Sequence, residues 1–524
     1  MTNDAGSLPP GYRQIPSRVN IAREVIDKQL EAGLGDRTAL VFAGGRLSYE
    51  ELGRRVDGLV NGLLDQGIGR GTKVLFRMPN CPEFAVAFLA LAKLGGLPVL
   101  QNSLLAPEEV GYVLDHSGAE AAITLADCAG SLREARGRLP LGLMVARGAG
   151  AGERCFEELI AGADAGPLQA ADTAADEPAF LVYTSGTTGR PKGIVHGHRW
   201  VIALGDSNRY RIPPEPSDVA LATGEWSFIS ALGHNLLFPL RNGVTGAILE
   251  GRALPERVLA AIGEFHVTLV YSVATVYRRI LAMDDVEASF DLTSLRGCNA
   301  TGEALEAATC EEWKRRMGCE IWEHYGISEM QMVLGQGPRW KLRPGSIGKP
   351  LPGTRVAVQD DDGRPVAVDT IGHLLIASDN PGFFLGYHRD PQKTREVMHD
   401  GWYHTGDLAH VDGDGYFWIA GRSDDCFKSR GIFISPIEIE DAIRRHGAVA
   451  EACVVPMADA EIGNRIRAVI VARDGTETGA ALADDIRAML KTAIAPYKVP
   501  QIIEFADQLP RSAVGKILRR ELIQ

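Results

Sequence analysis

The sequence contains no Cys-x-x-Cys pair, no long uninterrupted apolar run and no basic segment followed by an apolar one near its start. Its eight cysteines show no zinc-ligand spacing, so we expect reduced, mostly packed thiols in a cytoplasmic protein. Residues 1–16 do not have the pattern of a signal peptide. The longest apolar stretch, residues 84–100, is interrupted by Lys93, Gly95 and Gly96. It therefore predicts a buried helix followed by a strand, and no membrane span.

The composition is ordinary for a soluble globular protein, with 45% hydrophobic and 23% charged residues. A chain of 524 residues exceeds a single-core domain, so we expect at least two domains. The net charge of −12 argues against nucleic acid as a partner, although it leaves room for a local basic site that binds an anion. We find no internal repeat and no low-complexity segment.

The order of the predicted helices and strands indicates an α/β protein. Ser48 and Glu51 form a capping box, and helix and strand patterns then alternate to about residue 125, which favours a parallel sheet. Residues 147–178 predict a surface excursion. From about residue 350 short strands and turns predominate, and the last hundred residues predict a small α+β unit. We therefore predict an α/β N-terminal part with a β-rich region after it, and a small α+β C-terminal unit.

The most informative segment is residues 183–193, which read YTSGTTGRPKG. Apolar residues flank it on both sides, so it predicts a loop between two strands. Glycines, hydroxyls and exposed N–H groups suit an anion with many oxygens, and Lys192 adds a positive charge. The segment is not a Walker A loop, because Pro191 stands where the second glycine belongs. It predicts a cradle for a polyphosphate.

This loop resembles the phosphate-loop signature of the adenylate-forming superfamily, which includes acyl- and aryl-CoA ligases, peptide synthetase adenylation domains and firefly luciferase. Three further segments resemble the superfamily's motifs in the expected order: HYGISE at 324–329, YHTGD at 403–407 with Gly-Arg at 421–422, and SAVGKI at 512–517. The resemblance spans residues 20–522. It implies an α/β fold with a large N-terminal domain of stacked α/β sheets with a β-rich subdomain, plus a small mobile α+β C-terminal domain. Residues 343–350 and 428–436 look most like benzoate-type aryl-CoA ligases, and medium-chain fatty acyl-CoA ligases are similar too.

The resemblance implies three small-molecule partners, namely a carboxylic acid, ATP and coenzyme A, with Mg²⁺ as cofactor. The residues implied to bind ATP or AMP are Thr184, Ser185, Gly186, Thr187, Thr188, Gly189, Lys192, Thr301, Gly302, Glu303, His324, Tyr325, Gly326, Ser328, Glu329, Asp407, Arg422 and Lys516. Glu329 and Thr184 would hold Mg²⁺, since hard oxygen ligands suit this ion. Asp407 would accept hydrogen bonds from the ribose. The residues implied in catalysis are Lys516, Thr184, Lys192 and Glu329, and Lys516 would bridge the reacting anions.

The acid-binding pocket is less well determined by the sequence. Candidate residues are Trp226, Phe228, Ser230, His234, Tyr271, Ala274, Gly326 and Met332, and they suit one ring with small polar substituents. Burial in an ordinary core explains the same residues equally well. Where the superfamily has a tighter Gly/Ser pair, this chain has Asn299 and Ala300. The resemblance therefore does not determine which residues form the floor of the pocket. His196 and His198 resemble a metal pair only superficially, and we favour a structural role.

The implied reaction has two steps, formation of an acyl-AMP and transfer of the acyl group to coenzyme A. The domains would be residues 1–421, a hinge at 422–426 centred on Asp424, and a mobile domain at 427–524. Lys428 and Gly431 would face coenzyme A. The alternatives are a medium-chain fatty acyl-CoA ligase, a ligase that loads a carrier protein, a luciferase-type oxidative enzyme and a non-catalytic nucleotide sensor. The resemblance is compatible with a monomer or a homodimer.

Overall fold

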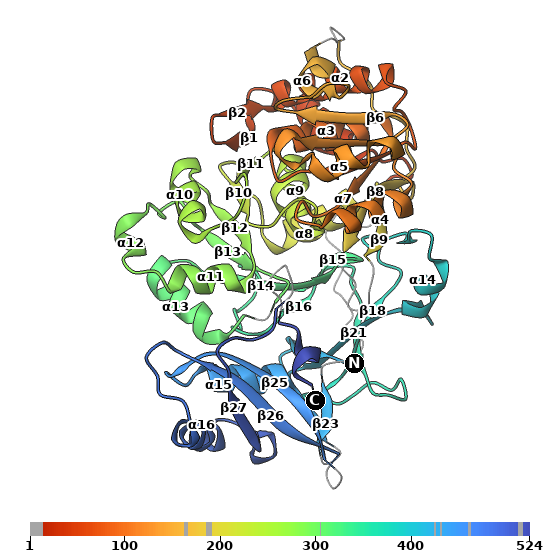
Figure 1. Cartoon of the computed structure of the whole chain (residues 1–524). Coiled ribbons are helices and arrows are strands. Elements are labelled where there is room, and N and C mark those ends of the chain that lie inside the picture. Colours follow the sequence, from red (N-terminus) through yellow and green to blue (C-terminus); the bar gives the residue numbers. More distant parts are fainter. Residues whose placement is uncertain are drawn as a thin grey trace.

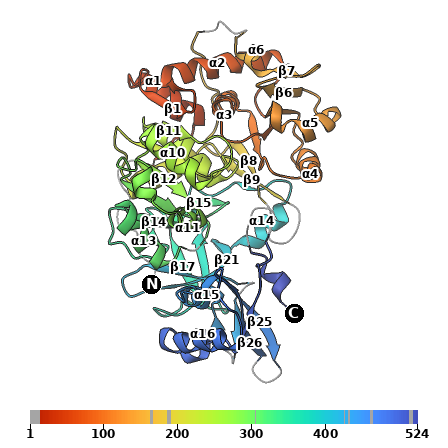
Figure 2. The same cartoon turned by 60° about the vertical axis from the view of Figure 1, so that its left-hand side comes forward.

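The computed structural model describes residues 14–161, 166–184, 191–303, 305–423, 426–429, 432–459, 463–511 and 517–523. The chain forms a large N-terminal body and a smaller C-terminal unit, which lies below the body in Figures 1 and 2. Among the described residues, three sheets build the body and two small sheets build the C-terminal unit. The predicted fold class, a large α/β domain with a β-rich part and a small α+β domain, is confirmed.

The first large sheet is parallel through its centre and has the strand order β16-β15-β14-β13-β12-β10-β11-β1-β2. Its strands are β1 (Thr38–Phe42), β2 (Gly45–Ser48), β10 (Val219–Ala222), β11 (Thr245–Ile248), β12 (Leu269–Ser272), β13 (Gly297–Ala300), β14 (Ile321–Ile327), β15 (Met330–Gly335) and β16 (Lys349–Pro350). Strands β15 and β16 run antiparallel at one edge, so the chain reverses sharply between β14 and β15.

The second large sheet has the order β19-β9-β8-β4-β3-β5-β6-β7. Its strands are β3 (Lys73–Arg77), β4 (Leu97–Leu100), β5 (Ala121–Leu125), β6 (Gly142–Ala146), β7 (Arg154–Cys155), β8 (Pro178–Thr184), β9 (Lys192–Gly197) and β19 (Gly386–Tyr387). Strands β8 and β9 form an antiparallel hairpin in which Thr184 pairs with Lys192, so the predicted strand-loop-strand arrangement is confirmed. Strand β19 comes from much later in the chain and pairs with β9 at the sheet edge.

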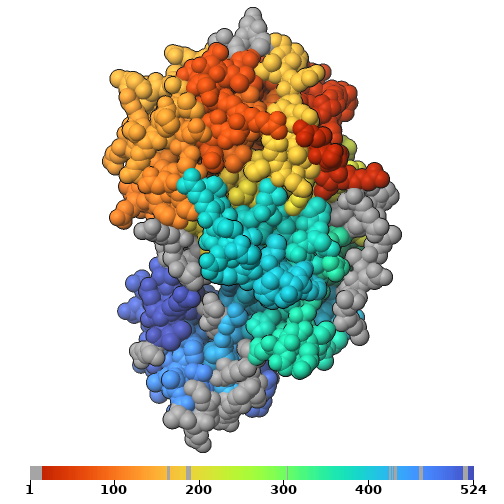
Figure 3. Space-filling view, turned by 90° about the vertical axis from the view of Figure 1, so that its right-hand side faces the viewer, coloured from red at the N-terminus to blue at the C-terminus, as the bar shows by residue number. Residues whose placement is uncertain are grey.

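The third sheet of the body contains β17 (Val356–Gln359), β18 (Gly372–Ala377), β20 (Met398–His399), β21 (Trp402–Val411) and β22 (Phe417–Arg422). Figure 3 shows the segment around residues 370–400 across the middle of one face, between the N-terminal part and the C-terminal unit. The C-terminal unit contains β23 (Phe427–Ser429), β24 (Ile432–Ile434), β25 (Val449–Asp459), β26 (Gly463–Ala472) and β27 (Ile502–Phe505). It has a hydrophobic core of its own.

The helices of the body cover and separate these sheets (Figure 1). They are η1 (Arg23–Asp27), α1 (Lys28–Glu31), α2 (Tyr49–Asp65), α3 (Pro82–Leu94), α4 (Pro107–Ser117), η2 (Ala126–Cys128), α5 (Gly130–Glu134), η3 (Arg136–Arg138), α6 (Phe156–Ala161), α7 (Trp200–Arg211), α8 (Ile229–Ala231), η4 (Leu232–Leu237), α9 (Phe238–Arg241), α10 (Pro255–Phe265), α11 (Ala274–Leu281), α12 (Val286–Ser289), α13 (Ala307–Met317) and α14 (Pro391–Val397). The C-terminal unit adds α15 (Pro436–Arg444), α16 (Ala480–Ala493), η5 (Pro496–Lys498) and η6 (Arg519–Leu522).

Local sequence signals account for several of these boundaries. The Ser48 hydroxyl accepts from the Glu51 N–H at 3.1 Å and begins α2, and the Ser435 hydroxyl accepts from the Glu438 N–H at 3.4 Å and begins α15. The described residues of 147–178 are mostly exposed or half-buried, as expected for a surface excursion, and they include β7 and α6. Helix α6 approaches α2 closely where Gly62 leaves no side chain; a Cβ there would lie 2.4 Å from the Leu159 carbonyl oxygen.

The largest buried cluster takes side chains from both large sheets and from α3, α7 and η4. A second cluster fills the opposite face of the first sheet, beneath α10, α11 and α13. None of the helices in the described ranges combines the length and the apolar character that a membrane crossing requires.

Candidate functional site

Asp407 lies between Tyr325 and Arg422, which are also predicted to bind the nucleotide. It stands on β21 directly opposite Arg422 of β22, and its Oδ1 accepts from Arg422 Nη1 at 3.0 Å. The Tyr325 hydroxyl donates to Asp407 Oδ2 at 2.5 Å. Burial, and next the charge of Asp407, raise the pKa of Tyr325, so the phenol keeps its proton and donates. Three of the predicted nucleotide residues therefore meet at one point, and one of them is a carboxylate that can accept from a diol.

At a second point, Glu329 and Lys192 both lie against Tyr387, a residue that none of the sequence motifs contains. Tyr387 donates its hydroxyl hydrogen to Glu329 Oε1, and Lys192 Nζ lies 5.4 Å from the centre of the Tyr387 ring. Strand β19 holds Tyr387 there, since Leu385 N–H donates to the Val195 carbonyl at 2.7 Å. No local pattern marks Tyr387, because its position depends on strand pairing with a segment about 190 residues earlier.

The second point can hold Mg²⁺ only with help from a ligand. The described residues contain no group of three His, Cys, Asp or Glu side chains that could bind a metal by themselves. Glu329 offers one carboxylate, and the β8–β9 hairpin places Thr184 opposite Lys192. One or two protein oxygens, with phosphate and water oxygens completing the shell, is the usual arrangement for Mg²⁺. The residues present therefore fit this ion.

The turn after β13 serves partly as a structural tie. Glu303 accepts from Thr275 Oγ1 at 2.8 Å and from Arg278 Nη2 at 3.0 Å, so its carboxylate links the turn to α11. Gly302 has a φ of +87°, in the left-handed region that favours glycine. Thr301 N–H donates to the Ser272 carbonyl at 3.2 Å. Contact of Thr301, Gly302 and Glu303 with ATP stays a prediction.

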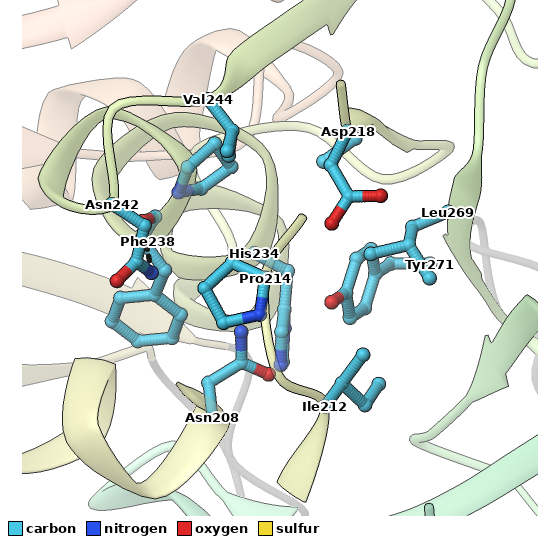
Figure 4. A pocket seen from close by; sticks show the side chains of 12 residues that line it. Asn208, Ile212, Pro214, Asp218, His234, Phe238, Asn242, Val244, Leu269 and Tyr271 are labelled. Atoms are coloured by element: carbon cyan, nitrogen blue, oxygen red, sulfur yellow. Dashed lines mark hydrogen bonds between the residues drawn. The ribbon is translucent and has the colours of Figure 1, made fainter. Parts of the chain in front are cut away.

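Four of the predicted acid-pocket residues converge. The His234 ring stacks on the Tyr271 ring at 4.3 Å, and its Nε2 lies 3.4 Å from the Met332 sulfur. Its Nδ1 lies 2.9 Å from the Ser230 carbonyl oxygen. Figure 4 shows His234 and Tyr271 beside Asn208 around a cavity of about 20 Å³. Burial, and next Arg211, lower the pKa of His234, so its imidazole is neutral at pH 7.

The other four predicted pocket residues have different surroundings, although Gly326 also adjoins Met332. Trp226 is fully buried and donates its indole N–H to Asn235 Oδ1 at 2.9 Å, in agreement with the core alternative. The Phe228 side chain is 43% exposed, and Ala274 belongs to the cluster on the other face of the sheet. Gly326 has a backbone role, because a Cβ there would lie 1.6 Å from the Gln331 carbonyl oxygen.

His324 lies beside the predicted acid-pocket residue His234. Its ring is 4.9 Å from the ring of His234, whereas the neighbouring Tyr325 extends toward Asp407. The preference for a structural role of His196 and His198 agrees with their contacts: His196 Nε2 lies 3.1 Å from the Ser328 carbonyl oxygen, and His198 Nδ1 accepts from the Ile21 N–H at 3.2 Å.

Several predicted residues lie outside the described residues. They are Ser185, Gly186, Thr187, Thr188, Gly189, Asp424, Gly431 and Lys516. Lys428 lies in β23. The domain bounds 1–421, 422–426 and 427–524 also stay predictions, although β22 ends at Arg422 and a separate core follows.

Family models match both parts of this architecture. Residues 27–388 match the model described as AMP-binding enzyme, and residues 438–516 match the AMP-binding enzyme C-terminal domain. The chain belongs to the AMP-binding enzyme family. The predicted membership of the adenylate-forming superfamily is thereby confirmed.

Two curated members of the AMP-binding family align over nearly the whole chain. A benzoate–CoA ligase of Thauera aromatica is 33% identical over 99% of this chain and 98% of that protein. A 3-hydroxybenzoate–CoA ligase of Aromatoleum sp. (strain CIB) is 33% identical over 97% of each.

Solved structures of the same family agree in fold. An anthranilate CoA ligase in complex with anthranoyl-AMP has a TM-score of 0.90 and 31% identity, with 98% of each chain covered. A benzoate CoA ligase from Burkholderia xenovorans LB400 has a TM-score of 0.84 and 29% identity, with 96% of this chain and 99% of that chain covered. The predicted enzyme class, an AMP-forming carboxylate–CoA ligase, is confirmed.

Proposed function

We propose that this enzyme activates an aromatic, benzoate-like carboxylic acid with ATP and transfers the acyl group to coenzyme A. The observation that carries the proposal is the convergence of separate motifs: Tyr325, Asp407 and Arg422 meet at one point, and Glu329 and Lys192 meet at another. We infer an aromatic acid because the relatives are a benzoate–CoA ligase, a 3-hydroxybenzoate–CoA ligase and an anthranilate CoA ligase.

In the first step a carboxylate oxygen of the acid bonds to the α-phosphorus of ATP, and pyrophosphate leaves with the electron pair of the broken P–O bond. The protein contributes position and charge neutralisation. Asp407 accepts from the ribose hydroxyls while Arg422 and Tyr325 hold its carboxylate in place. Lys192 places a cation beside the phosphates, and Lys516 would neutralise the charge that builds up as the two anions meet.

Mg²⁺, when bound, neutralises phosphate charge and orients the leaving pyrophosphate. Glu329 and Thr184 are the residues that would hold it. Tyr387 fixes the rotamer of Glu329 by donating to Oε1, which leaves the other carboxylate oxygen for the ion.

In the second step the thiol of coenzyme A loses its proton to solvent and its sulfur bonds to the acyl carbon. The C–O bond to AMP breaks, and AMP leaves with the electron pair of that bond. The two steps need different partners at one site, so the C-terminal unit would turn at Asp424 between them. We also propose a cytoplasmic location, with which the eight free cysteines agree. A monomer or homodimer stays a prediction.

The Asp407→Asn variant tests the nucleotide site. We expect the amide to weaken charge-assisted hydrogen bonds to Arg422 and to ribose, and so to lower kcat/KM for ATP by about 10- to 100-fold. Release of AMP with benzoate and coenzyme A measures this. Asp360→Asn, at an exposed turn before β18, is the control and should retain wild-type activity. Wild-type kinetics for Asp407→Asn would remove the ribose assignment.

A substrate panel tests the acid and the acceptor. Benzoates, hydroxybenzoates, aminobenzoates and C4–C10 fatty acids are compared by kcat/KM, first with coenzyme A and then with a phosphopantetheinylated carrier protein. Higher values for a fatty acid, or turnover with the carrier alone, would support the alternative ligases.

A further inference from the structure

A row of side chains on one face of the first sheet faces the predicted acid pocket. Tyr271 on β12 pairs in register with Asn299 on β13, and Asn299 pairs with Trp322 on β14. Side chains alternate between faces along a strand, so His324 shares the face of Trp322. Tyr271 and Trp322 both belong to the largest buried cluster, on the same side as His234.

Four polar residues in or beside this row of side chains are buried almost completely. We call them the polar cluster: Arg211, Asn299, His324 and Gln331. Their exposed fractions are 0%, 0%, 2% and 2%. His324 and Arg211 approach each other around Gly335, because a Cβ built on Gly335 would lie 3.3 Å from His324 Cβ and 2.7 Å from Arg211 Cδ. Gln331 reaches His234 at 2.9 Å.

The polar cluster has hydrogen-bonding capacity that the described protein does not use. Both side-chain polar atoms of Asn299, both ring nitrogens of His324, Gln331 Oε1 and Arg211 Nε have no hydrogen-bond partner in the described part of the chain. Buried polar groups in proteins are almost always paired. Six such atoms beside candidate pocket residues therefore indicate a ligand with polar atoms of its own at this depth.

The charge of the cluster indicates which polar atoms these are. Arg211 donates to the Gln336 carbonyl at 3.1 Å and lies 3.5 Å from Asn208 Oδ1, and it contacts no carboxylate among the described residues. Burial lowers the pKa of Arg211 to about 10, so it remains protonated at pH 7. Burial and Arg211 also lower the pKa of His324, which leaves that ring neutral, with one donor and one acceptor nitrogen. A positive field favours an oxygen atom in the ligand over an amino group.

We propose that the polar cluster binds a hydroxyl group on the ring of the acid, so that the preferred substrate is a hydroxylated aromatic carboxylic acid. This inference rests on the proposed aryl–CoA ligase function and narrows its substrate class. Asn299, His324 and Arg211 would then be specificity-determining residues, because leaving their polar atoms unpaired penalises an acid that lacks the hydroxyl.

The first test uses the wild-type enzyme. Values of kcat/KM are measured from AMP release with coenzyme A for benzoate, the three hydroxybenzoates, the aminobenzoates and the methoxybenzoates. We expect the best hydroxybenzoate to exceed benzoate and every other acid by at least about 100-fold. A ratio below 10 over benzoate, or a preference for an aminobenzoate, overturns the inference. If no acid in the panel releases AMP, the proposed function itself fails, and the two failures are thus distinct.

The second test uses Asn299→Leu, which removes the amide and nearly keeps the volume. We expect the ratio of kcat/KM for hydroxybenzoate to kcat/KM for benzoate to fall at least 10-fold. The matched control is Asn61→Leu, because the amide nitrogen of Asn61 on α2 also has no hydrogen-bond partner among the described residues, and Asn61 lies far along the chain from the cluster. The ratio for this variant should not change. If Asn299→Leu lowered kcat/KM equally for all acids, Asn299 would have a structural role and the assignment would be overturned. If this variant does not fold, the wild-type ratios of the first test decide the inference.

Discussion

At the residue scale, the hydroxyl of Tyr387 connects the predicted metal residue to the phosphate-loop lysine. It donates to Glu329, and its ring lies under Lys192. We predict that Tyr387→Phe retains the fold but lowers kcat/KM for ATP by about 10-fold, because Glu329 loses a charge-assisted hydrogen bond. The Mg²⁺ concentration for half-maximal activity should rise as well. Tyr210→Phe is the control, on α7 beside Trp340. Unchanged Mg²⁺ dependence in Tyr387→Phe would contradict the positioning role.

Also at the residue scale, two buried histidines should make stability depend on pH. Burial lowers the pKa of His196 to about 3 and that of His198 to about 4. Both are neutral in the folded protein but take up a proton near pH 6.5 when unfolded, so the unfolded state binds more protons below that pH. Their contribution to stability is complete above about pH 6.5 and is lost as the pH falls toward the folded values.

We expect the free energy of unfolding to fall by roughly 1 kcal/mol per pH unit for each histidine between pH 6 and pH 4.5. Urea unfolding followed by tryptophan fluorescence measures it. His198→Asn keeps an acceptor for the Ile21 N–H and should flatten the dependence, whereas His373→Asn, at an exposed position, should not. Equal slopes in these two variants would show that His198 is not the group that titrates.

At the element scale, the β14–β15 hairpin carries both Tyr325 and Glu329, and Gly326 permits its tight reversal. We predict that Gly326→Ala lowers the free energy of unfolding by about 2 kcal/mol or more and abolishes adenylation, because the new Cβ meets a backbone oxygen that cannot move alone. Gly413→Ala is a matched control in the β21–β22 turn, where a Cβ meets no atom within 4 Å. Thermal unfolding and pyrophosphate exchange provide the two readouts. If both variants behaved as wild type, the close approach at Gly326 would have no energetic importance.

At the scale of the whole molecule, we propose that the small C-terminal unit serves both chemical steps. Its helix α15 contacts the body through Arg444, which lies 3.3 Å from Glu306. We predict that Lys516→Ala lowers pyrophosphate exchange at least about 100-fold but leaves thioester formation from preformed acyl-AMP within a few-fold of wild type. Asp424→Pro, which restricts φ, should have the opposite effect. Equal losses in both half-reactions would contradict a division of labour between two orientations.

The sequence by itself determined the local features and the chemistry of the motifs. Local patterns in the sequence suffice for the Ser48 and Ser435 caps, the β8–β9 hairpin and the parallel α/β pattern, because each depends on residues close together in the chain. The order of the four motifs also sufficed to predict the family.

Only the tertiary structure decided which side chains meet. Tyr387 reaches Glu329 because β19 pairs with β9. His324 shares a sheet face with Asn299 because of the register between β13 and β14, and Arg211 of α7 approaches His324 around Gly335. A shift of one residue in any of these strands would turn each side chain to the other face. Trp226 and Phe228 show the same limit: the resemblance to the family's pocket motif suggested both, yet Trp226 is fully buried in the core and Phe228 is 43% exposed. Such contacts depend on packing between distant segments, and no local pattern encodes that packing.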